Sequence, residues 1–171
     1  MAVRRLGALA LLLVSLWGCG YRPLGAAPPD SQVRPTLAIP LFTNRSTEVG
    51  LETIFATALI NAFAQIGAVK VVPGDRDADL VLEGKVRSVD NTSVAFESIT
   101  QSTVRRVSLR IELTLRRKKG DKVLWKDTQI LQEDYVVDTN YHLGEATKTE
   151  GIQRAAVTLA RRVLDKVLLV I

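Results

Sequence analysis

The stretch Arg105–Arg117, RRVSLRIELTLRR, decides the fold class of this 171-residue chain. Apolar residues occupy every odd position from Val107 to Leu115, and polar or charged residues occupy every even position from Arg106 to Arg116. Successive side chains of a β-strand point to opposite faces, so this strict alternation predicts a strand in a sheet with one buried face and one polar face. Another layer of structure must therefore cover the apolar face.

Further long strands are predicted on both sides of this stretch. Asp79–Val89 alternates in the same way, and Lys118–Asp121 is a turn that leads into a returning strand over Lys122–Val136. Between the first two long strands, Asn91–Thr103 is polar and rich in Ser and Thr. We interpret this segment as a loop or a poorly ordered extension.

Residues 51–66 predict an amphipathic helix. Ser46 or Thr47 is expected to cap its start, Glu48 suits the positive end of the helix dipole, and Gly67 is expected to end it. The apolar residues recur at the i, i+3, i+4 spacing of a helix that buries one face. They are Leu51, Ile54, Phe55, Ala58, Leu59, Ala62, Phe63 and Ile66.

A second helix is predicted at the end of the chain. Thr147 and Glu150 have the spacing of a capping box, which predicts that the helix starts there. An unbroken apolar stripe follows, with the same helical spacing. Its members are Ile152, Ala155, Ala156, Leu159, Ala160, Val163, Leu164, Val167 and Leu168.

Two shorter apolar runs complete the expected elements. Thr36–Phe42 and Val69–Val72 predict short strands, and Pro40 places the first at a sheet edge or a strand end. The one-sided helices and the one-sided sheet can bury their apolar faces against each other. We therefore expect an α+β two-layer sandwich, with two helices packed on one face of an about four-stranded, antiparallel-rich mixed sheet.

The N-terminus has the features of a bacterial lipoprotein signal. Arg4 and Arg5 precede the apolar run Leu6–Val14, and Leu16-Trp17-Gly18-Cys19 resembles the lipobox cut by the lipoprotein peptidase. This predicts a signal peptide over residues 1–18, with Cys19 acylated as the first residue of the mature protein. Cys19 is the only cysteine, so no disulfide competes for its thiol.

The segment after Cys19 is expected to hold the protein at a membrane surface. Residues 19–35 contain four prolines and little that can pack, which predicts a lipidated flexible tether before a single domain over residues 36–171. The familiar inner-membrane retention signal is an acidic residue after the cysteine, but Gly20 occupies that position. We therefore expect the periplasmic side of the outer membrane.

The sequence offers no catalytic constellation, so an enzyme is not expected. Cys19 is expected to be blocked by lipid, and His142 has no cysteine partner and is expected in a loop. Asp75, Asp77 and Asp79 lack the remaining ligands of a calcium loop, so neither a metal nor another cofactor is predicted. The net charge of +5 and the aromatic fraction of 5% do not suggest nucleic acid.

Positive charge is concentrated on the long strand and its turn. One interpretation is a soluble turn and an edge protected against aggregation. The other is recognition of an anionic ligand, since Arg binds phosphate in a bidentate manner and Lys binds it as a point charge. In the outer membrane the ligand would be lipopolysaccharide (LPS). The candidate phosphate-binding residues are Arg106, Arg110, Arg116, Arg117, Lys118 and Lys119.

Several segments together resemble the LPS-assembly lipoprotein family, LptE. The resemblance includes the Ala-rich terminal helix and covers nearly the whole predicted mature chain. The other segments are Cys19–Leu24, Leu37–Ser46 followed by Gly50–Glu52, Ala78–Gly84, and Gly120–Trp125.

The resemblance implies a partner rather than a reaction. Members of the family form a plug inside the β-barrel of the LPS translocon, LptD, and help deliver LPS to the outer leaflet. Known members have two helices on a four-stranded sheet, and some contact LPS through basic residues. An envelope scaffold lipoprotein that does not bind LPS is the alternative. An envelope hydrolase has only the compartment in its favour.

Overall fold

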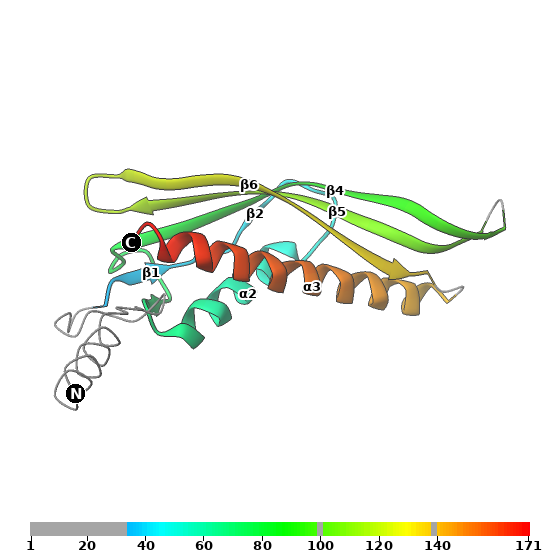
Figure 1. The fold of residues 1–171 in the computed structure, drawn as a ribbon, viewed down its shortest axis with the longest axis horizontal. Coiled ribbons are helices and arrows are strands. Elements are labelled where there is room, and N and C mark those ends of the chain that lie inside the picture. The colour runs from blue at the N-terminus through cyan, green and yellow to red at the C-terminus, as the bar shows by residue number, and fades with distance from the viewer. Residues whose placement is uncertain (1–33, 99–100, 138–139) are drawn as a thin grey trace, which may run out of the picture.

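A computed structural model describes residues 34–98, 101–137 and 140–171 as two layers, with a twisted sheet above and both helices below it (Figure 1). Cys19, the expected signal peptide and most of the expected tether lie outside these described residues. In chain order the elements are β1 (Thr36–Ala38), β2 (Thr43–Asn44), α2 (Leu51–Ile66), β3 (Lys70–Val72), β4 (Leu80–Ser98), β5 (Gln101–Arg117), β6 (Lys122–Val136) and α3 (Tyr141–Leu168).

The sheet is mixed, with strand order β3-β1-β4-β5-β6 and β2 beside β4. The short strands pair in parallel, whereas β4, β5 and β6 form an antiparallel meander. This confirms the α+β two-layer prediction, with six strands in place of about four. The first apolar run forms only the short strand β1, which ends at Ala38, before Pro40, and β2 begins just after the run, at Thr43. Since β1 lies inside the sheet, Pro40 marks a strand end and not an edge.

The core lies between the inner face of the sheet and the two helices. The odd positions of β5 from Val107 to Leu115 are fully buried, as the alternation predicts. Each helix turns its apolar stripe to the same core, with Leu59 of α2 and Leu159 of α3 both fully buried. No helix in the described ranges is both long enough and apolar enough to span a bilayer.

The interpretation of Asn91–Thr103 as a loop is wrong. Strand β4 continues to Ser98, β5 starts at Gln101, and their paired ends reach beyond the end of β6 (Figure 1). Backbone pairing extends to Ala95↔Val104 and Phe96↔Ser102, with several register shifts on the way. We call these paired ends of β4 and β5 the arm. Alternating polarity did not predict the arm, because neither of its faces is buried in the core and so neither face has to be apolar.

The predicted start of α2 at Ser46 or Thr47 is also wrong. Gly50 is the N-cap, with a left-handed φ of 85°, and no side chain caps the helix. Ser46 instead belongs to the preceding loop, where its Oγ donates to Asn44 Oδ1 at 2.7 Å. At the other end Gly67 is the C-cap with φ of 66°, which confirms the predicted stop.

The capping box at Thr147 and Glu150 is wrong, because α3 begins at Tyr141. Asn140 caps it, and its Oδ1 accepts from the backbone N–H of His142 at 3.0 Å. The Thr147 hydroxyl donates to the carbonyl oxygens of Val136 and Gly144, at 2.6 and 3.0 Å. His142 therefore lies in the first turn of a helix, and not in a loop.

The added first turns of α3 hold the loop that precedes α2. Lys148 is 9% exposed, and its Nζ lies 2.5 Å from Glu48 Oε1 and 3.6 Å from Glu145 Oε2. Burial alone lowers the pKa of Lys148, but the hydrogen bond to Glu48 and the nearby carboxylates outweigh it, so this pKa is raised. Glu48 thus acts as an ion-pair partner of α3.

Candidate functional site

Neither α2 nor α3 covers the outer face of the sheet, since both described helices lie on its other side (Figure 1). The polar side chains of the three long strands lie on this outer face. Strand β5 contributes its even positions from Arg106 to Arg116, whose neighbours are set by the antiparallel register on both sides. Three of the predicted phosphate-binding residues, Arg106, Arg110 and Arg116, therefore lie on one face. The sequence pattern predicted this arrangement from period two alone.

Arg106 is already paired on this face. Its Nε and Nη2 donate to the two carboxylate oxygens of Asp134, at 2.6 and 2.9 Å, across the β5–β6 register Arg106↔Asp134. This bidentate hydrogen bond raises the pKa of Arg106 and lowers the pKa of Asp134. A phosphate would have to displace or share that carboxylate.

Arg116, near the other end of β5, is also paired. It donates to Asp121 in the β5–β6 turn and lies 3.9 Å from Glu83 of β4. The hydrogen bond to Asp121 raises the pKa of Arg116. Between these two ends, Arg87 of β4 pairs with Glu112 at 2.8 Å, and the hydrogen bond lowers the pKa of Glu112.

Arg110 is the candidate on the outer face that stays available. It is exposed and lies between Ser88 of β4 and Ile130 of β6. Within the described ranges no ion pair or side-chain hydrogen bond engages its guanidinium. Ile130 beside it is 54% exposed, so this part of the face joins a free cation to an apolar side chain.

The remaining candidates lie at the β5–β6 end of the sheet. Arg117 ends β5 and is exposed, and Lys118 and Lys119 form the turn with Gly120, whose φ is 83°. Lys118 Nζ donates to the carbonyl oxygens of Asp75 and Arg76, the latter at 3.0 Å, so it anchors the turn to the β3–β4 loop. Arg117 and Lys119 remain exposed to solvent.

The spacing of these cations limits what they can bind. Strand residues rise about 3.3 Å each, so Arg106 and Arg110 are roughly 13 Å apart and Arg110 and Arg116 roughly 20 Å. One phosphate cannot reach all three. The outer face therefore suits a ligand with several separated anionic groups. A metal site is a separate question, and no group of three or more metal-ligating side chains occurs in the described ranges.

Sequence reasoning left out basic residues of the neighbouring strands. Lys85 lies opposite Glu112, and Lys126 lies opposite Thr114 on the other side of β5. The alternation of Asp79–Val89 already placed Lys85 and Arg87 on the polar face. Which of these residues lie next to Arg110 depends on the register of β4 and β6 against β5, and the pattern of a single strand does not give that register.

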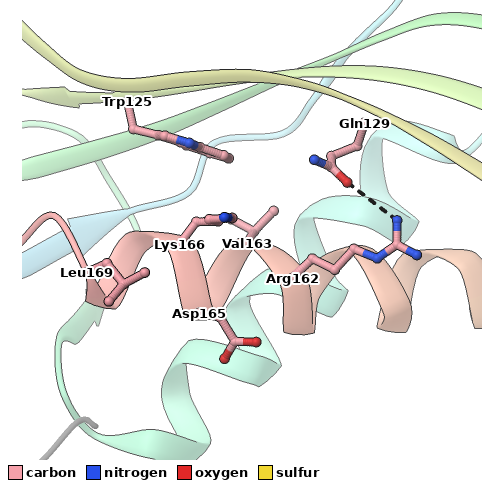
Figure 2. A pocket seen from close by; sticks show the side chains of 7 residues that line it. All are labelled: Trp125, Gln129, Arg162, Val163, Asp165, Lys166 and Leu169. Atoms are coloured by element: carbon pink, nitrogen blue, oxygen red, sulfur yellow. Dashed lines mark hydrogen bonds between the residues drawn. The ribbon is translucent and has the colours of Figure 1, made fainter.

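A second feature is a groove on the helix side of the sheet. It has a volume of about 400 Å³ and lies between β6 and the C-terminal turns of α3. Figure 2 shows the Trp125 ring above Lys166 and Val163, Arg162 reaching toward Gln129, and Asp165 pointing away from β6. The Arg162 Nη1 to Gln129 Oε1 distance is 3.4 Å.

Comparison with known proteins identifies a family and a fold. The sequence model of the lipopolysaccharide-assembly family LptE matches residues 34–167. No curated protein matches the chain.

Three solved structures have the same fold over most of this chain. Rare lipoprotein B from Shewanella oneidensis is 14% identical, with a TM-score of 0.52 over 77% of this chain and 92% of that one. A hypothetical protein from Chlamydia trachomatis is 9% identical, with a TM-score of 0.57 and coverages of 80% and 96%. A Xanthomonas campestris protein is 16% identical, with a TM-score of 0.56 and coverages of 84% and 89%. At these identities the likeness shows the fold alone.

Proposed function

This chain belongs to the lipopolysaccharide-assembly family LptE, and from that premise we propose that it is the lipoprotein subunit of an outer-membrane LPS translocon. In this role it forms the plug of an LptD-type β-barrel and helps insert LPS into the outer leaflet. The observation that carries the proposal is the family match over residues 34–167, which includes every described strand, α2, and α3 up to its last residue but one. The role is that of a binding and assembly subunit and involves no catalysis.

The polar outer face supports this role. The lumen of a membrane barrel is polar, so a plug needs a solvated surface with few apolar side chains. The outer face offers ion pairs such as Arg87–Glu112 and Arg106–Asp134, together with the free cation Arg110. Salt-linked polar surfaces of this kind suit a wet interface. The paired ends of β4 and β5 replace the loop or poorly ordered extension expected at Asn91–Thr103.

The test of the proposal is complex formation with the barrel. We expect the native lipoprotein, purified from outer membranes, to retain a barrel partner in stoichiometric amounts. Depleting the lipoprotein should lower both the assembled barrel and surface LPS. Normal barrel assembly and normal surface LPS after full depletion, with no barrel co-purifying, would support the scaffold alternative.

We propose that Cys19 carries the membrane anchor and that residues 19–35 are the tether. Acyl chains on the first residue attach a protein to a bilayer without spanning it. Intact-mass analysis of the membrane-extracted protein should show loss of residues 1–18 and added acyl mass. A protein that retains Met1, or that washes off membranes in buffer, would contradict this proposal.

We propose that the six basic candidates contact LPS phosphates. Arg106 and Arg116 already form ion pairs and Lys118 bonds to backbone carbonyls, so the other three are expected to contribute most to LPS binding. Arg110, Arg117 and Lys119 are exposed, and none of them has an ion pair or side-chain hydrogen bond within the described part of the chain. Arg110→Glu, Arg117→Glu and Lys119→Glu together should weaken LPS capture by about tenfold at low salt, since exposed contacts contribute roughly 0.2–1 kcal/mol each. The difference should shrink toward 1 M salt, where the Debye length is about 3 Å.

Arg161→Glu is the matched control for Arg110→Glu made alone, because each reversal changes the net charge by the same amount. Arg161 is an exposed arginine on α3, in the other layer of the molecule, so its reversal changes net charge in the same direction without touching the outer face. Capture that falls equally in the control would mean that net charge alone matters. Unchanged capture in the triple variant would return these residues to a solubilising role.

A further inference from the structure

Strand β6 is an open edge of the sheet. It pairs with β5 on one side, and no other strand of the described ranges lies on its other side. The N–H of Val137 donates to the carbonyl of Thr103 at 3.0 Å, in register with the Val104↔Val136 pair. In an antiparallel ladder, hydrogen-bonded and non-hydrogen-bonded pairs alternate. The odd residues of β6 back to Trp125 therefore bond to β5, and the even residues turn their N–H and C=O groups outward.

The ends of this edge are capped, but its centre is not. Asp127 Oδ1 accepts from the Thr128 N–H at 2.8 Å, and Arg154 and the Thr147 hydroxyl donate to the outward carbonyls of Asp134 and Val136, at 3.0 and 2.6 Å. These three bonds confirm which residues face outward. For Ile130 and Gln132, no hydrogen bond to the outward backbone groups exists within the described part of the chain.

The side chains at the centre of the edge do not protect it. Natural edge strands avoid pairing with other chains through charges, prolines or bulges. Residues 128–132 of β6, TQILQ, carry no charge and no proline, and the β5–β6 register is regular from Val104↔Val136 to Leu115↔Trp125. Ile130 is 54% exposed at its centre. An uncharged, regular edge with free backbone groups is a template for one more strand.

Two hollows lie beneath this edge, between β6 and α3. One is the groove beside Trp125 and Gln129 (Figure 2), and the other has a volume of about 560 Å³ beside Glu133 and Glu150. Strand side chains that point to one face repeat every second residue, and Gln129 and Glu133 are four residues apart. The inward side chains of one added strand would therefore lie over both hollows.

We propose that the edge of β6 binds an extended segment of the barrel partner as an additional strand, centred on Ile130. Backbone hydrogen bonds to Ile130 and Gln132 would give affinity, and the hollows would select side chains, as in other cases of strand addition. The apolar surface of Trp125, Val163 and Leu169 suits an apolar side chain. The carboxylates of Glu133 and Glu150, with only Arg154 as a cation, suit a basic side chain. This inference rests on the proposed function.

The position of α3 favours a single segment over a second copy of this chain. Helix α3 packs beneath β6 and buries Leu131 and Tyr135. Paired strands lie about 4.8 Å apart, whereas packed helices need about 8–10 Å between their axes. Two copies joined through β6 would therefore crowd their α3 helices. A lone extended segment brings no helix with it.

Residue-resolved amide hydrogen exchange on the full-length lipoprotein, alone and in its complex with the barrel, tests this inference. In the free protein the amides of Gln129 and Leu131 should be protected by β5, while those of Ile130 and Gln132 exchange freely. In the complex the exchange of Ile130 and Gln132 should slow by at least about a hundredfold. A complex that forms while these two amides stay unprotected overturns the inference and leaves the proposed function standing. Absence of any complex overturns both.

Two substitutions of Ile130 distinguish the contribution of its backbone N–H to barrel binding from that of its side chain. Ile130→Pro removes an outward N–H but no hydrogen bond to β5, so the free protein should fold and its affinity for the barrel should fall by about tenfold or more. Ile130→Thr keeps the N–H and should bind within about threefold of the native chain. Equal affinity of the native chain and the folded proline variant contradicts the inference. So does protection of Ile130 and Gln132 in a dimer of the lipoprotein alone.

Discussion

Leu59→Asp is expected to leave this chain unfolded at 25 °C. Leu59 lies in the middle of α2, is fully buried, and packs in the single core between the helices and the inner face of the sheet. Truncating a buried leucine to alanine costs about 2–5 kcal/mol, and a carboxylate with no partner adds its own desolvation. The sum approaches the whole stability of a typical domain, about 5–15 kcal/mol.

Thr57→Asp is the matched control, because Thr57 lies two residues away on the exposed side of the same helix. It introduces the same carboxylate into the same helix and should cost less than about 1 kcal/mol, which is the size of a helix-propensity effect. Far-ultraviolet circular dichroism and urea titration of both variants measure the difference. A folded Leu59→Asp protein with native-like cooperativity would show that α2 does not pack as described.

The parts of the fold that could be predicted are those in which burial imposes a period. Val107 to Leu115 and the stripes of residues 51–66 and 152–168 have one face in the core, so their sequences repeat with the period of the element. The arm at Asn91–Thr103 has no such constraint. Its order comes from backbone pairing between β4 and β5, which any polar sequence can supply.

The starts of both helices were missed for a related physical reason. The sequence offered Ser46, Thr47 and Thr147 as caps, but a side-chain cap is one of several ways to satisfy the first N–H groups of a helix. At α2, Gly50 starts the helix with no side-chain cap at all, and Lys148 of α3 holds the preceding loop through Glu48. That ion pair joins residues 100 positions apart, and local pattern cannot reveal it.

The sequence predicted which basic residues share a face of the sheet. It did not predict which of them lack an ion-pair partner. Alternation alone places Arg106, Arg110 and Arg116 together, and the structure agrees. Whether a cation is free depends on its neighbour across the strand, which is Asp134 for Arg106 but Ile130 for Arg110. Register decides this, because one residue of slip would place both arginines opposite other residues of β6. The open edge of β6 likewise follows from strand order, which no single strand encodes.

Gly84→Ala is expected to destabilise the domain by about 3 kcal/mol, the upper part of the range for overpacking a core. A methyl group on Gly84 of β4 would occupy the space of the Phe42 ring, which lies directly over the glycine. Phe42 is 4% exposed and stacks on Phe55 of α2, with ring centroids 5.9 Å apart and planes at 18°. Displacing that ring therefore disturbs the contact between the sheet and α2 as well.

Gly74→Ala is the control, since Gly74 has no neighbour within 4 Å of an added methyl group and should change stability little. The cause can be isolated by repeating Gly84→Ala in a Phe42→Leu background, where a smaller side chain leaves room for the methyl group. The two substitutions should then be less destabilising together than the sum of their separate effects, by about 1–2 kcal/mol, because they share one space. Chemical denaturation of the four proteins of this cycle measures the coupling. Strict additivity would mean that the cost of Gly84→Ala arises in the strand backbone and that Phe42 does not require a glycine beneath it.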